Sequence, residues 1–147
     1  MRFLHACDKL GKKGRNNKEA TMIIVKDRKN IELEWQVTEI LHEFGVPAHL
    51  KGYGYIREAI MMLVEDMEIA HSITKVLYYD IAKKHGTTVS KVERSIRNAV
   101  EVSWARGNIE AFEKYFGYSI AGGRRKPCNS EYMVQIADRI RLNSMAC

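Results

Sequence analysis

The sequence predicts an all-α domain, a bundle of about six helices that contains a helix-turn-helix. Apolar residues recur at helical spacing in several segments, and no segment alternates long enough for a useful strand. Glycines separate these segments, and only two prolines interrupt them. With 147 residues, 46% of them hydrophobic, the chain is long enough for one domain with a substantial core.

The net charge of +6 is concentrated in residues 1–30, which hold nine basic and three acidic side chains. Residues 31–147 hold fifteen of each sign. The first 30 residues show no sustained periodicity, and a glycine-punctuated basic stretch lies at 11–18. We therefore expect a flexible basic tail or linker remnant at 1–30 and the folded domain at 31–147.

The first helix is expected from Ile31 to Phe44, ending at Gly45 and Pro47. Its apolar stripe consists of Ile31, Trp35, Val37, Ile40, Leu41 and Phe44. A second helix is expected at about 53–69, with its inward side formed by Ile56, Ile60, Leu63, Val64 and Met67.

Four further helices are expected at about 74–78, 79–85, 89–106 and 108–116. Gly86 and Gly107 separate them, because glycine readily adopts the left-handed conformation that ends a helix. After a loop at 122–128, Asn129 is the expected N-cap of a final helix. Its predicted buried side is Met133, Ile136, Ala137, Ile140 and Leu142.

Residues 80–96 have the spacing of a helix-turn-helix. Ala82 is small where two helices would cross, Gly86 suits the turn, and Val92 would join the second helix to the first. On a helical wheel of residues 89–106, the side chains of Val92, Ala99, Val100 and Ser103 lie on the same side as Ile96. The opposite half carries Ser90, Lys91, Arg94, Arg97 and Asn98, residue types that bind guanine edges, adenine edges and phosphates.

Glu93 lies at the shoulder of this face and has two interpretations. It can accept a hydrogen bond from a cytosine amino group, or it can pair with Arg97 four residues on. Thr87, Thr88 and Ser90 can cap the helix start, where backbone amides can also point at a phosphate. Arg124, Arg125 and Lys126 are either further phosphate contacts or a merely solvated basic loop.

Other kinds of chemistry have little support. Cys7, Cys128 and Cys147 are widely spaced, and the five histidines lack metal-ligand spacing. We expect no metal, no cofactor and no enzymatic activity. No apolar run approaches the roughly 20 residues of a membrane span, and no signal peptide is evident, so we expect a cytoplasmic protein.

Several strings closely resemble one family, the effector domains of the sporulation response regulator stage 0 sporulation protein A. They are residues 45–53, 72–78, 92–97 and 102–109, and the resemblance extends over about residues 31–143. Tyr79, Val89 and Asn98 differ from the residues usual in that family, which bears on flank preference and affinity rather than on the fold.

This resemblance implies a six-helix effector-domain fold that reads short boxes in double-stranded promoter DNA, often as a tandem dimer. It implies base contacts by Glu93 and Arg94, with Lys91, Arg97 and Asn98 on bases or phosphates nearby. It also implies a surface for the sigma subunit of RNA polymerase between 107 and 120. The contacts expected there are Asn108, Ile109, Ala111, Phe116 and Ile120. Plain packing by the apolar side chains of this segment is the alternative.

The family also carries a phosphoacceptor receiver domain, which 30 residues are too few to form. We therefore expect either an excised effector domain or a stand-alone relative outside phosphorelay control. Two other functions stay open. One is an interaction module or antagonist that acts on a partner protein, and the other is non-specific coating of nucleic acid by the basic tail.

Overall fold

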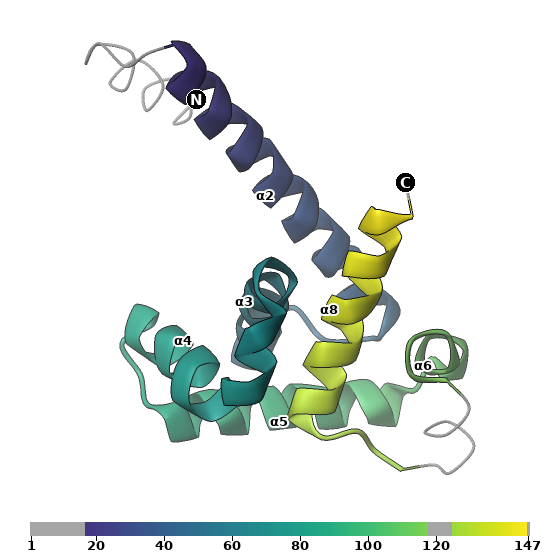
Figure 1. Ribbon diagram of the computed structural model, residues 1–147. Helices are drawn as coiled ribbons and strands as arrows, with labels where there is room; N and C mark the ends of the chain where they lie inside the picture. The colour runs from purple at the N-terminus through teal and green to yellow at the C-terminus, as the bar shows by residue number, and fades with distance from the viewer. Residues whose placement is uncertain (1–16, 118–124, 147) are drawn as a thin grey trace. The chain divides into compact units, whose positions relative to one another are not determined.

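The computed structural model describes residues 17–117 and 125–146, and within them it contains helices and no strand (Figure 1). The predicted all-α fold is confirmed. The α-helices in the described ranges are α2 (Asn17–Glu43), α3 (Lys51–Glu65), α4 (Tyr79–Lys84), α5 (Val89–Arg106), α6 (Ile109–Phe116) and α8 (Asn129–Met145). A 3₁₀ segment, η1 (Met67–Ser72), and a π-helical turn, η2 (Ile73–Tyr78), connect α3 to α4.

The chain divides into two compact units, Met1–Leu33 and Glu34–Cys147. In the first unit, residues 17–33 form the N-terminal part of α2, and Met22, Ile24 and Ile31 are exposed there. The second unit contains the last turns of α2 and all the other helices.

The expectation of a flexible tail over residues 1–30 is wrong for 17–30, which are helical, while residues 1–16 lie outside the described residues. The later turns of α2 are anchored by the buried side chains of Val37, Ile40 and Leu41. Once a helix exists, each added residue costs only its own ordering and gains one hydrogen bond, so the helix extends without an apolar stripe. Ile31 and Trp35, expected to be inward, are 50% and 64% exposed.

The expected helix at 53–69 is two elements. Asp66 has an extended backbone after α3, and its side chain accepts a hydrogen bond from the Glu68 amide, which starts η1. This carboxylate cap offers the backbone an alternative to a continuing helix, a local effect that apolar periodicity does not reveal. Ile56, Ile60 and Leu63 are buried as predicted, whereas Val64 and Met67 are half-buried.

The core of the second unit is built on an aromatic cluster. The Phe44 ring packs edge-on against Phe112 with the centroids 4.8 Å apart, and Tyr132 and Phe116 lie beside them. Tyr132 is fully buried, and burial raises the pKa of its hydroxyl well above the ordinary value. That hydroxyl is satisfied by Ser103, whose own Oγ donates to the Phe44 carbonyl at 2.8 Å.

The final helix, α8, buries four of its five predicted inward residues, namely Met133, Ile136, Ala137 and Ile140. Leu142, the fifth, is 53% exposed. The N-cap of α8 is Cys128, and the expected cap, Asn129, is the first helical residue instead. Its side chain bonds to a different helix, as described below.

Candidate nucleic-acid interface

A helix-turn-helix is formed by α4 and α5. Gly86 has a φ of 62°, the left-handed conformation predicted for the turn, and the Thr87 amide donates to the Ala82 carbonyl at 2.9 Å. Ala82 is buried where the helices meet, and Val92 and Ile96 are fully buried on α5. Each of the three marker residues in the sequence motif therefore has the structural role predicted for it.

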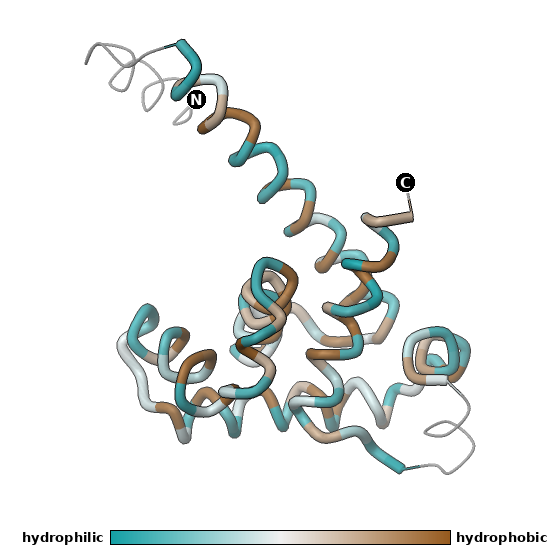
Figure 2. Tube along the Cα trace, in the orientation of Figure 1, coloured by the Kyte–Doolittle hydropathy of each residue, from teal (hydrophilic) through white to brown (hydrophobic). Residues whose placement is uncertain are grey.

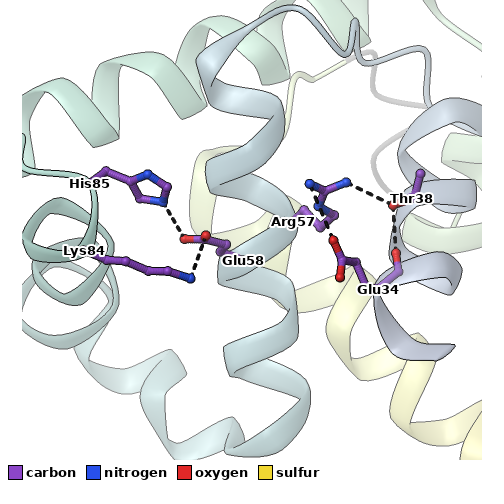
Figure 3. Close-up of polar contacts among 6 residues, drawn as sticks. All are labelled: Glu34, Thr38, Arg57, Glu58, Lys84 and His85. Atoms are coloured by element: carbon purple, nitrogen blue, oxygen red, sulfur yellow. Dashed lines mark hydrogen bonds and ion pairs between the residues drawn. The ribbon is translucent and has the colours of Figure 1, made fainter. Parts of the chain in front are cut away.

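A polar cluster fastens the end of α4 to α3 (Figure 3). Glu58 of α3 accepts a hydrogen bond from Lys84 Nζ at 3.0 Å, and its other oxygen lies 2.9 Å from His85 Nε2. Burial raises the pKa of Glu58, but the bonds from His85 and Lys84 outweigh it, so the pKa lies below its usual value. This cluster fixes the turn that precedes α5.

The same figure shows how α3 is joined to the last turns of α2. Arg57 Nη1 donates to Thr38 Oγ1 at 3.3 Å, and Arg57 Nη2 lies 3.7 Å from a Glu34 carboxylate oxygen. Because Arg57 and Glu58 are adjacent in α3, one turn of that helix carries polar links to α2 and to α4.

The start of α5 has a side-chain cap. Thr88 has an extended backbone, and its hydroxyl accepts a hydrogen bond from the Lys91 amide at 3.3 Å. Ser90 and Lys91 are exposed in the first turn, and Thr87 is half-buried before it. The cap leaves backbone N–H groups at the helix start that can point at an anion.

The buried face of α5 consists of Val92, Ile96, Ala99, Val100 and Ser103, as the helical wheel predicts. Along α5, Figure 2 shows hydrophobic positions interrupted by hydrophilic ones. Lys91, Arg94 and Asn98 are exposed on the other side. We call Lys91, Glu93, Arg94, Arg97 and Asn98 the reading face.

Glu93 and Arg97 form an ion pair on the reading face, one of the two interpretations the sequence leaves open for Glu93. Glu93 is half-buried, and Arg97 is exposed. Arg94 is exposed and makes no ion pair within residues 17–117 and 125–146. Arg94 is therefore the guanidinium of the reading face that does not have to exchange a protein carboxylate for a ligand.

The basic loop before α8 is partly described. Lys126 Nζ donates to Glu101 Oε1 of α5 at 2.8 Å, and this bond holds the pKa of Glu101 below its usual value. Arg125 Nη2 lies 3.5 Å from Glu131 Oε1. Both cations are exposed and paired within the chain, whereas Arg124 lies outside the described residues.

The residues expected to contact a sigma subunit differ in burial: some are exposed and others are buried. Asn108 caps α6 by accepting from the Ala111 amide, and Ile109 is 67% exposed. Ala111 and Phe116 are buried, so packing describes them better than a surface contact does. Ile120 lies outside the described residues.

The link between α8 and α5 is not predicted by the sequence. Asn129 Nδ2 donates to the Glu93 backbone carbonyl at 3.2 Å. The asparagine itself was visible in the sequence, but a side chain that bonds to a distant backbone carbonyl leaves no local pattern.

The described residues contain no group of three or more metal-ligating side chains. None of their helices combines the length and hydropathy of a membrane span. The geometry of α4 and α5 places this chain among the helix-turn-helix domains.

The family follows from the sequence match. Residues 37–140 match the family described as "Sporulation initiation factor Spo0A C terminal". The match covers most of the chain, so this chain belongs to that family. It is a DNA-binding domain of a sporulation transcription regulator, in a family of DNA-binding rather than enzymatic domains.

Proposed function

We propose that the domain regulates sporulation genes by reading promoter boxes through the N-terminal half of α5 in the major groove. The observation that carries this proposal is the exposure of Arg94 on the reading face without an ion pair in the described part of the chain. A guanidinium presented in this way can make the bidentate contact to guanine O6 and N7 that is the commonest base-specific contact.

The rest of the reading face supplies complementary contacts. Lys91 and Asn98 flank Arg94, and asparagine can bond adenine in a bidentate manner. Glu93 and Arg97 can contact bases only after their ion pair with each other is broken. Their contribution therefore depends on the DNA sequence that is bound. Base discrimination therefore depends mainly on Arg94.

Phosphate contacts fix the register on the duplex. The capped start of α5 offers backbone N–H groups together with the side chains of Thr87, Thr88 and Ser90. Arg125 and Lys126 bind phosphate by leaving Glu131 and Glu101, and Arg124, the neighbouring basic residue in the sequence, is a further phosphate contact. Exposed ion pairs of this kind contribute little, so a phosphate can replace the carboxylate at small cost.

We further propose that Asn108 and Ile109 contact the sigma subunit of RNA polymerase, and that two copies bind adjacent boxes as a tandem dimer. An isoleucine that is 67% exposed beside the acidic Glu110 and Glu113 supports an apolar contact with a basic rim on the partner. Ala111 and Phe116 support this surface from beneath.

Two experiments test the proposal. The preferred duplex is first selected from a random pool, and the protein is then titrated with the selected duplex and with its scrambled form over a series of salt concentrations. We expect a consensus box and a preference for it that persists as salt rises. Equal salt-sensitive binding to both duplexes would indicate non-specific coating. Weak binding to both, with capture of purified sigma subunit, would indicate the interaction module.

A further inference from the structure

Asn129 joins two elements of the second unit. It opens α8, and its side chain donates to the Glu93 backbone carbonyl of α5 at 3.2 Å. The half-buried amide of Asn129 therefore links the start of α8 to the first turns of α5.

Side-chain packing does not fill the space at this junction. A hollow of about 480 Å³ opens between the start of α8 and the outer half of α5. Glu93, Arg97 and Asn129 are among the residues that line it. Side chains do not fill this hollow, so polar contacts help to position the start of α8 against α5 here.

Two such contacts lie at the hollow, apart from the buried hydrogen bond between Ser103 of α5 and Tyr132 of α8. One is the hydrogen bond from Asn129 to Glu93, and the other is the exposed pair of Lys126 with Glu101. The second pair is available to solvent and salt, and Lys126 is also a proposed phosphate contact. The half-buried amide of Asn129 remains when Lys126 turns to DNA.

We propose that Asn129 is a positioning residue for base reading: its amide holds the Glu93 backbone, and with it the reading face, at the orientation that a specific box requires. This inference rests on the proposed function. A backbone carbonyl in a helix has a second lone pair beyond the one used by the i+4 amide, so the contact leaves the α5 hydrogen bonds intact. Asn129 touches no base itself.

The test compares Asn129→Asp with Ser130→Asp, each in the full chain. An ionised aspartate is nearly isosteric with asparagine but cannot donate to a carbonyl. A carboxylate in the first turn also favours the helix dipole, so α8 keeps its start. Ser130→Asp adds the same charge one residue on and retains the Asn129 amide.

Two quantities are measured for each variant: the ratio of dissociation constants for scrambled and selected duplexes, and amide hydrogen exchange over residues 90–97 without DNA. We expect Asn129→Asp to lower the ratio about fivefold relative to Ser130→Asp, the effect of one net hydrogen bond. Affinity for scrambled DNA should be the same in both. Exchange should accelerate only in Asn129→Asp.

The inference is overturned if the two variants keep the same ratio while the unsubstituted protein discriminates, or if exchange is unchanged in Asn129→Asp. An equal fall of the ratio in both variants would also overturn it, because added charge alone would then explain the loss. If the unsubstituted protein does not discriminate, the proposed function fails, and the hydrogen-exchange result shows separately whether Asn129 orders α5.

Discussion

Gly52 of α3 lies against the backbone carbonyl of Ser95 in α5, with no space for a side chain between them. A Cβ on Gly52 would also lie 2.8 Å from the Ala99 Cβ. The two helices cross at this point, on the buried side of α5 opposite Arg94. The close approach of α3 to α5 therefore depends on the absence of a side chain at residue 52.

Gly52→Ala is expected to destabilise the domain despite the higher helix propensity of alanine. The added methyl group meets backbone, which cannot move as a flexible side chain can, so overpacking should cost about 1–3 kcal/mol. Gly54→Ala, in the same helix with nothing within 4 Å, is the matched control and should stabilise by about 0.5–1 kcal/mol. Denaturant unfolding of both variants checks the pair, and equal effects would contradict the close approach.

Ser103→Ala should destabilise by about 1–3 kcal/mol, because it leaves the Tyr132 hydroxyl and the Phe44 carbonyl without this buried partner. Ser144→Ala is the comparison, since its hydroxyl donates to the Ile140 carbonyl near the exposed end of α8. Thermal unfolding of the two variants should differ clearly. A Ser103→Ala protein as stable as Ser144→Ala would show that water replaces the lost hydroxyl.

The cluster around Glu58 predicts that part of the free energy of unfolding is lost at acidic pH. The pKa of Glu58 is lower in the folded protein than its usual value of 4.5, so folding favours the ionised form. The stabilisation is complete above the unfolded-state pKa and is lost as the pH falls through the folded-state pKa. Glu58→Gln should therefore lower stability at pH 7 and flatten its decline below about pH 4.5. Parallel curves for the two proteins would contradict this link.

Removal of residues 1–30 should leave the stability of the second unit nearly unchanged and reduce the salt dependence of DNA binding. The segment holds nine basic side chains, and residues 17–29 are exposed. Fewer cations near the duplex release fewer counterions, so log K should fall less steeply with log salt while box preference persists. Loss of cooperative unfolding on deletion would show that the segment is structural.

The helix-turn-helix could be predicted from the sequence because its determinants are local. Gly86, Ala82 and Val92 act within a dozen residues, and the inward face of α5 follows from helical geometry alone. The cap at Thr88 is likewise a short-range signal.

Other features depend on contacts between segments distant in the chain. The apolar character of Ile31 and Trp35 predicts burial, but both side chains are exposed, and the buried residues of α2 are Val37, Ile40 and Leu41. The part of α2 that begins at Asn17 extends a helix whose buried residues lie in its later turns. The bond from Asn129 to Glu93 joins residues far apart in sequence, and no pattern in a single sequence encodes it.

The central claim is that α5 reads bases through Arg94. It is tested most directly by measuring whether the Arg94→Ala variant still discriminates the selected duplex from its scrambled form. Arg141→Ala, which removes another exposed arginine from the last turns of α8, is the control for charge. Arg94→Ala should lower the ratio of affinities for selected and scrambled duplexes by about 5- to 150-fold, the range of one bidentate base contact, while Arg141→Ala keeps it. An Arg94→Ala protein that discriminates as well as the unsubstituted chain would contradict base reading by this face of α5.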